Sequence, residues 1–250
     1  MGRSFDRAAE RYDKARGGEG RGERFAAEIE PYLLTGTRAA ILEIGVGTGV
    51  VAAALQRRGH RVFGADIAME MLRVGLRRAS GLVRYDGWSL PFASATFDAA
   101  YMVWVIHLVD DQRALLQEAA RVLRPGGRLA IATINREPDD QVRRITEPMY
   151  RTLLRDNWRR DDLDRVMKAA SSKELREVAR AMGIPFAYQT SGEAEAARIE
   201  ERSSSLFWDL ADHEWREHVV PVIQRLRALG RVTIIREQTH EILVLEKSQV

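Results

Sequence analysis

Short apolar runs alternate with helical stretches through the central part of the chain. Uninterrupted apolar runs predict buried strands, whereas apolar residues three and four positions apart predict amphipathic helices. The predicted strands are 39–44, 61–65, 82–85, 98–106 and 128–133. The helices predicted between them are 49–58, 68–78 and 111–123. Strands that alternate with helices at this spacing indicate βαβ units and a parallel sheet.

The N-terminal segment before these strands has a different pattern. Residues 3–16 carry a helical apolar stripe, which consists of Phe5, Ala8, Ala9 and Tyr12. Residues 16–22 contain four glycines and should break the helix, and a second amphipathic segment follows over 23–34. Residues 1–34 are therefore predicted to form a hinged helical flap.

The C-terminal half is mostly helical in pattern. The predicted elements are a long helical stretch to about residue 170, a helix over 172–182, a strand over 184–188, helical residues over 193–227 and a closing strand over 239–245. Both late strands are expected to return to the central sheet. The chain is thus predicted to be a single α/β domain over 1–250 with two helical insertions, at 136–170 and 194–231.

Composition and charge narrow the classes of function. The chain has 250 residues, 45% hydrophobic and 30% charged, which is typical of a soluble globular protein. Its 39 basic and 36 acidic residues are interleaved and leave a net charge of +3, so a nucleic-acid partner is not favoured. The absence of cysteine excludes a thiolate nucleophile and a disulfide framework, and no metal-ligand pattern appears.

The N-terminus bears on localisation. It lacks the apolar region of a signal peptide, and no stretch approaches the roughly 18 apolar residues of a membrane span. We therefore expect a cytoplasmic protein without a membrane partner.

A glycine loop follows the first predicted strand. Glycines at 45, 47 and 49 allow a tight turn and close approach to a ligand, at a helix N-terminus with free N–H groups. A dinucleotide fingerprint would place its third glycine at position 50, which is valine. The carboxylate of Glu43 instead indicates a ligand with a cationic or hydroxyl-bearing part.

Two further carboxylates and a turn follow in order. Asp66 ends the second strand, 21 residues after Gly45, where ribose hydroxyls would lie in a nucleotide site. Asp86 follows the third strand in the context Asp-Gly-Trp-Ser-Leu-Pro-Phe. Residues 122–129 read Val-Leu-Arg-Pro-Gly-Gly-Arg-Leu and end a helix before the fifth strand.

These four signatures in this order resemble the class I S-adenosylmethionine-dependent methyltransferases. The stretch 39–133 looks most like the small-molecule branch related to ubiquinone and menaquinone C-methyltransferases. The resemblance implies a Rossmann-like, doubly wound, seven-stranded and mostly parallel sheet whose last strand, near 239–245, is antiparallel. It also implies S-adenosylmethionine as the cofactor. The residues expected to bind it are Tyr12, Glu43, Gly45, Val46, Gly47, Gly49, Asp66, Ile67, Met71, Asp86, Gly87 and Val103.

His107 follows the fourth strand, at the rim where the family places substrate-facing residues. A reference pKa near 6.5 suits a general base at neutral pH, so His107 is the candidate catalytic residue. The alternative is a polar residue that caps the strand end or lines the cofactor site. Methyl transfer from a sulfonium needs mainly in-line placement, so a dedicated base is dispensable.

Aromatic residues mark the candidate acceptor site. The predicted insertions contain Trp158, Trp208 and Trp215, and Trp104 lies beside His107. Both insertions are expected to lie over the carboxyl ends of the strands as a helical cap, where open α/β sheets bind ligands. Trp104, His107 and Trp208 are the candidate substrate-binding residues. The alternative is that these aromatic residues form the core of the insertions.

The sequence therefore predicts a methyltransferase that acts on a small molecule. The alternative is an enzyme that methylates a nucleic acid or other macromolecule, which the sequence pI of about 9.4 motivates. Against it, the Asn/Asp-Pro-Pro-Tyr motif of many base methylases is replaced by Val-Trp-Val-Ile over 103–106. A nicotinamide oxidoreductase and a non-catalytic cofactor-binding protein are further alternatives, and Val50 argues against the oxidoreductase.

Overall fold

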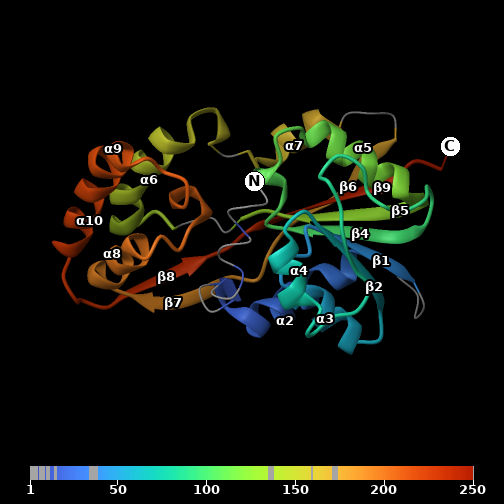
Figure 1. Cartoon of the computed structure of the whole chain (residues 1–250), viewed down its shortest axis with the longest axis horizontal. Coiled ribbons are helices and arrows are strands. Elements are labelled where there is room, and N and C mark those ends of the chain that lie inside the picture. Colours follow the sequence, from blue (N-terminus) through green and yellow to red (C-terminus); the bar gives the residue numbers. More distant parts are fainter. Residues whose placement is uncertain are drawn as a thin grey trace. The chain divides into compact units, whose positions relative to one another are not determined.

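The computed structural model describes residues 5, 9, 12–13, 16–33, 39–134, 138–158, 160–170 and 174–249. The chain divides into two compact units (Figure 1). The sheet unit comprises residues 1–134, 160–183 and 241–250, and the helical unit comprises residues 135–159 and 184–240. Each unit has its own hydrophobic core.

A seven-stranded sheet forms the centre of the sheet unit. Its strands, in spatial order, are β3 (Leu82–Arg84), β2 (Arg61–Asp66), β1 (Ala40–Ile44), β4 (Phe97–Val103), β5 (Leu123–Ala132), β9 (Glu241–Lys247) and β6 (Leu175–Met182). β9 is antiparallel to both of its neighbours, whereas β1 to β5 are mutually parallel. The predicted doubly wound α/β sheet with an antiparallel last strand is confirmed.

Helices cover both faces of this sheet, which gives three layers (Figure 1). One core lies between the sheet and α5 (Gln112–Val122) and α7 (Leu163–Ala170). The other lies between the sheet and α2 (Gly18–Ile29) and α3 (Val50–Arg57), with Leu72 of α4 (Met69–Gly75). Successive strand residues alternate between the cores, as expected for a sheet buried on both faces.

The N-terminal stripe packs on α4. The Phe5 and Tyr12 rings are 6.3 Å apart, and Ala9 is buried in a cluster with Met71. Ala8 lies outside the described residues.

The predicted break over 16–22 is present but is confined to Gly17. The backbone turns at Gly17, with φ of 88°, and α2 already begins at Gly18. A Cβ on Gly22 would lie 2.4 Å from the carbonyl oxygen of Val50. Glycine at this position therefore allows α2 to pack closely against the start of α3.

Two late elements also differ from the prediction. Residues 172–182 were expected to be helical, but β6 pairs with β9 and adds an edge strand to the sheet. The strand expected at 184–188 does not join this sheet: β7 (Phe186–Thr190) pairs with β8 (Ile234–Gln238) in a separate two-stranded sheet. Pairing with β9 outweighs local preference in the first case. In the second case the strand forms as predicted but has a different partner.

The helical unit packs its helices beside the two-stranded β7–β8 sheet. Its helices are α6 (Gln141–Leu154), α8 (Gly192–Glu200), α9 (Asp212–Glu214) and α10 (Val220–Arg227), with a π-helical turn over Trp215–Val219. Residues 160–170, expected in the first insertion, belong instead to the sheet unit, where α7 contributes Leu163 and Val166 to the core shared with α5.

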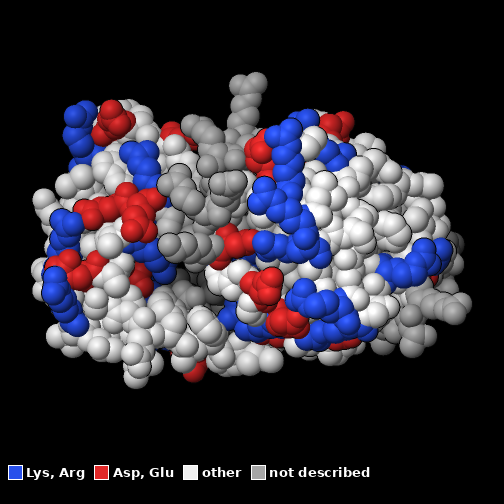
Figure 2. Space-filling view, turned by 60° about the horizontal axis from the view of Figure 1, so that its bottom comes forward, with Lys and Arg blue, Asp and Glu red and all other residues white. Residues whose placement is uncertain are grey.

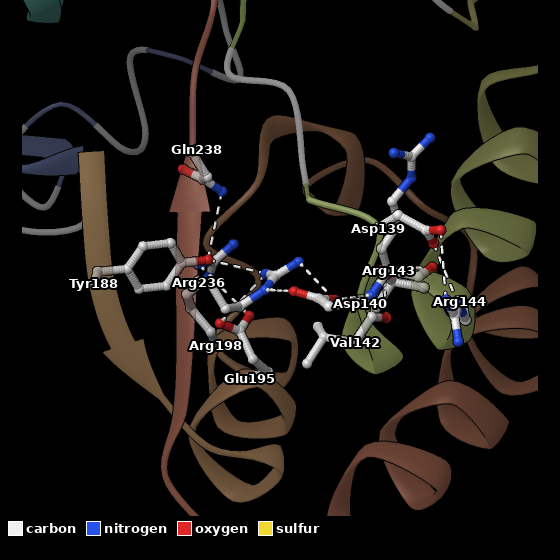
Figure 3. Close-up of polar contacts among 11 residues, drawn as sticks. Asp139, Asp140, Val142, Arg143, Arg144, Tyr188, Glu195, Arg198, Arg236 and Gln238 are labelled. Carbon is white, nitrogen blue, oxygen red and sulfur yellow. Dashed lines mark hydrogen bonds and ion pairs between the residues drawn. The ribbon is translucent and has the colours of Figure 1, made fainter. Parts of the chain in front are cut away.

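A buried arginine links the two-stranded β7–β8 sheet to α6 (Figure 3). The Arg236 side chain is 2% exposed and donates from Nε to Asp140 Oδ2 at 2.6 Å and from Nη1 to the Tyr188 hydroxyl at 2.9 Å. Asp140 also caps α6 by accepting the backbone N–H of Arg143 at 2.8 Å. One carboxylate thus joins the two-stranded β7–β8 sheet to the start of the helix.

Charged side chains of both signs lie next to one another over the face shown in Figure 2. Arg57 pairs with Glu23 and Arg58 with Glu30, both at 2.7 Å. Such exposed pairs add little stability. Over the described part of the chain, no helix is both long and apolar enough to cross a membrane.

Candidate functional site

The glycine loop joins β1 to α3 at the carboxyl edge of the sheet. Gly45, Gly47 and Gly49 have φ of 75°, 52° and 71°, a region that disfavours other residues. A Cβ on Gly45 would lie 2.3 Å from Val105 Cγ2, so this glycine is required by packing. No described atom lies within 4 Å of a Cβ built on Gly47, so the loop leaves open space there.

Asp66 ends β2 and holds this loop. Its Oδ2 accepts the N–H of Gly47 at 2.7 Å and its Oδ1 accepts the N–H of Ala68 at 2.8 Å. The residue is 9% exposed. A carboxylate has about four lone-pair sites, so each oxygen can accept more than one hydrogen bond. The nearby Ile67 is half-buried, whereas Met71 is buried against the N-terminal stripe.

Glu43 is a buried carboxyl group on β1. It is 3% exposed and accepts a hydrogen bond from the Tyr101 hydroxyl at 2.8 Å. Burial raises the pKa of Glu43 to about 8, although hydrogen bonds from Tyr101 and the Ala52 backbone and the charge of Arg21 oppose the rise. The Glu43 carboxyl is therefore mostly protonated at neutral pH in the free protein.

Asp86 and Gly87 follow β3 at the same edge. Asp86 is exposed, and its Oδ1 accepts the N–H groups of Trp88 at 2.8 Å and Ser89 at 3.1 Å. These hydrogen bonds lower the pKa of Asp86. Gly87 has φ of 91°, which suits glycine. Burial raises the pKa of the preceding Tyr85 to about 12.

The end of β4 contributes Val103, Trp104 and His107. Trp104 has φ of 57°, an uncommon backbone conformation for a bulky residue. Its ring centroid lies 5.3 Å from that of Phe25 in α2, edge to face. His107 lies in the short turn Ile106–Leu108 and is partly buried.

The N-terminal segment is fixed to the glycine loop by Asp13. The Thr48 hydroxyl donates to Asp13 Oδ1 and Arg78 Nη1 donates to Oδ2, both at 2.6 Å. The neighbouring Tyr12 ring lies 5.1 Å from the guanidinium carbon of Arg21. The predicted flap thus contacts the site directly.

Most of the predicted site residues come together in the sheet unit. Parallel strands place Glu43, Asp66, Asp86 and Val103 at one edge, around the loop that contains Val46. Trp208 lies in the helical unit, where its Nε1 donates to the Arg202 carbonyl at 2.7 Å.

Three residues of the site were not predicted from the sequence: Thr48, Tyr101 and Arg21. Strand alternation could have indicated Tyr101, because it occupies the register position opposite Glu43. Arg21 had no such signal, because it lies in the segment where the glycines indicated a break.

Comparison with known proteins finds similarity in the central part of the chain. Residues 42–131 match the family described as a methyltransferase domain. A demethylmenaquinone methyltransferase of Corynebacterium kroppenstedtii is 43% identical over 91 residues, 36% of this chain and 40% of the relative. The chain covers less than half the length of the first curated relatives.

Solved structures share the fold across nearly the whole chain. The [4+2]-cyclase SpnF has a TM-score of 0.61 at 14% identity and covers 99% of this chain and 94% of its own. A Haemonchus contortus phosphoethanolamine N-methyltransferase, complexed with phosphomonomethylethanolamine and S-adenosylhomocysteine, has a TM-score of 0.53 at 18% identity. The superposed region covers 93% of this chain and 53% of the Haemonchus contortus chain.

The sheet order is that of the Rossmann-like α/β fold that solved methyltransferase structures share, and residues 42–131 match the methyltransferase-domain family. Within that class, this segment resembles the demethylmenaquinone methyltransferases.

Proposed function

We propose that the chain is an S-adenosylmethionine-dependent methyltransferase that acts on a small molecule. One observation carries the proposal: the loop after β1 is open at Gly47 and is held by the carboxylate that ends the neighbouring strand. Such a loop offers backbone N–H groups to a nucleoside ligand. Its glycines also allow the ligand to approach the backbone closely without strain. The named relatives support a small-molecule acceptor.

The residues of the carboxyl edge fit the cofactor. Asp66 would hold the ribose hydroxyls, because each carboxylate oxygen can accept more than one hydrogen bond. Asp86, Gly87, Ile67 and Val103 would line the adenine side, and Glu43 would face the amino-acid end. The relative bound to S-adenosylhomocysteine has the same fold, which supports this assignment. When bound, S-adenosylmethionine supplies a methyl group carried on a sulfonium.

In this proposal the chain acts mainly by positioning. Holding donor and acceptor in line can lower the barrier by roughly 7–11 kcal/mol. His107 would accept the acceptor's proton where the acceptor is an acid, and Trp104 would contact the acceptor. The assignment of Trp208 to acceptor binding stays a prediction from the sequence.

Calorimetry with S-adenosylhomocysteine tests the cofactor, and transfer of a labelled methyl group from S-adenosylmethionine to demethylated quinols tests the acceptor class. We expect one binding site per chain and label in the quinol fraction. Absence of binding by the folded wild-type protein would overturn the proposal. Binding followed by label in RNA or DNA, rather than in a small molecule, would overturn the acceptor class alone.

A further inference from the structure

A pocket lies at the edge of the seven-stranded sheet where the parallel strands begin. Its volume is about 280 Å³, and residues near the starts of β1, β2, β4 and β5 line it together with the loop before β4. Small-molecule sites span roughly 300–1,000 Å³, and an apolar cavity of about 150 Å³ already holds benzene. The pocket therefore has room for one or two fused rings.

Three phenylalanine rings form one wall of this pocket. Phe97 is 1% exposed, and its ring centroid lies 4.9 Å from that of Phe92 and 5.9 Å from that of Phe63, both edge to face. Phe63 and Phe92 are only partly buried, so each leaves part of its ring uncovered at the pocket. Edge-to-face contact is a preferred geometry for aromatic pairs, so this phenylalanine wall suits a further aromatic ring.

The remainder of the lining is charged. Asp98 Oδ1 accepts a hydrogen bond from Arg124 Nη1, and its Oδ2 accepts the N–H of Ala40 at 2.8 Å. Burial opposes ionisation of Asp98, but these hydrogen bonds and the charges of Arg124 and Arg61 outweigh it and lower the pKa. Asp98 is therefore ionised at neutral pH and balances one of the two arginines. The lining keeps one net positive charge.

Arg61 supplies the unbalanced charge. It is the exposed first residue of β2, and its side chain makes no hydrogen bond or ion pair with any described residue. A guanidinium presents five N–H donors in a planar fork that matches a carboxylate. A cation of this kind beside the phenylalanine wall complements a ligand that carries both an aromatic ring and an anionic group.

We propose that this pocket binds a small aromatic carboxylate, with its ring against the phenylalanine wall and its carboxylate at Arg61. The site is separate from the proposed cofactor site, because Ala40 begins β1 whereas the glycine loop follows the end of that strand. Open α/β sheets bind their ligands at the carboxyl ends of the strands. The aromatic carboxylate is thus a second ligand, and its binding does not depend on the proposed function.

Amide NMR spectra of the isotope-labelled wild-type protein provide the first test. The probe is 2-naphthoate, and its uncharged analogue 2-naphthamide is the comparison. We expect saturable shifts at Ala40 and Thr96, with a Kd of roughly 0.1–1 mM for 2-naphthoate and roughly 3- to 10-fold weaker binding of 2-naphthamide. Equal affinities, or the absence of saturable shifts, would overturn the proposal. Shifts confined to Gly45 and Gly47 would place the probe at the glycine loop and would overturn it as well.

Variants then assign the two parts of the ligand. Arg61→Gln should weaken 2-naphthoate to about the affinity of 2-naphthamide and leave 2-naphthamide unchanged, whereas Phe92→Leu should weaken both probes roughly 2- to 10-fold. Arg57→Gln is the matched control, because Arg57 is an exposed arginine of α3 that pairs with Glu23. Thermal unfolding of each variant confirms that it is folded. Equal losses for both probes in Arg61→Gln, or unchanged binding in Phe92→Leu, would contradict the assigned pose.

Discussion

Glu43 makes the stability of the free protein depend on pH. Its pKa of about 8 lies above the ordinary glutamate value of 4.5, so the folded chain binds more protons than the unfolded chain between these values. The stability contributed by the neutral group is complete below about pH 4.5 and is lost as pH rises through 8. We expect the free energy of unfolding to fall by on the order of 3 kcal/mol from pH 5 to 8 through this residue.

Denaturant unfolding of Glu43→Gln at several pH values measures this effect. The free energy of unfolding of the variant should fall less steeply with rising pH than that of the wild type. The variant should also be the more stable protein at pH 8. Glu201→Gln, at an exposed glutamate, is the control and should keep the wild-type slope. Parallel profiles for the wild type and Glu43→Gln would refute the protonated state assigned to Glu43.

Asp66 should contribute to cofactor affinity through charge and hydrogen bonding. Asp66→Asn removes the charge and places an N–H₂ group against one of two backbone donors. We expect the affinity for S-adenosylhomocysteine to fall roughly 10- to 100-fold, equivalent to about 1–3 kcal/mol. Asp98→Asn is the control, because Asp98 binds a backbone N–H and Arg124 at the opposite edge of the sheet. A similar loss of affinity in both variants would show that Asp66→Asn acts through folding and not through a contact with the cofactor.

At the level of single residues, the sequence indicated the groups that follow strands. Glu43, Asp66 and Asp86 were predicted because strand ends and glycine spacing can be recognised along the chain. The Tyr101–Glu43 bond and the Arg21–Trp104 stack join positions 58 and 83 residues apart. Their partners depend on how α2 packs on the sheet, which periodicity does not specify.

The α2–α3 contact gives a prediction at the level of the helix. Gly22→Ala places a Cβ 2.4 Å from the Val50 carbonyl, so α2 must move, at a cost of about 1–3 kcal/mol. Gly20→Ala in the same helix meets no described atom within 4 Å and should stabilise the protein by roughly 0.5–1 kcal/mol. Denaturant unfolding of both variants measures the difference. Stabilisation by both substitutions would contradict the close packing of α2 on α3.

The elements that were predicted wrongly share a cause. Leu175, Val178, Ala179 and Met182 follow helical spacing, yet this segment is the edge strand β6, with a register shift between Glu177 and Ala179. Arg176 also pairs with Glu246 across the strands. The ladder with β9 provides backbone hydrogen bonds that local periodicity does not reveal. By contrast, β1 to β4 lie in the part of the chain where periodicity and turn residues agree.

For the whole molecule, the buried Arg236 tests whether the two units unfold separately. Arg236→Met leaves Asp140 without its cation and the Tyr188 hydroxyl without this donor, which should cost about 3–5 kcal/mol. We expect hydrogen exchange to accelerate in peptides from 184–240 and to remain slow in those from 39–134. Arg227→Met, at a half-exposed arginine paired with Glu200, is the control and should change exchange little. Equal acceleration in both units would indicate one cooperative structure.

The division into two units could not be predicted from the pattern alone. The sequence indicated helical insertions, but it placed α7 with the first insertion and β7 in the main sheet. Both assignments depend on which apolar faces meet: α7 packs on α5, whereas β7 pairs with β8. These are contacts between distant segments, and local signals do not distinguish them.

The bond between Asp13 and Thr48 has a consequence for how the protein is produced. The family match begins at residue 42, so a fragment cut to that boundary would lack Asp13, Arg21 and Phe25. It would keep every glycine of the loop but expose the apolar surface of α3 and the ring of Trp104. Expression vectors should therefore include residues 1–41 and carry purification tags after residue 250.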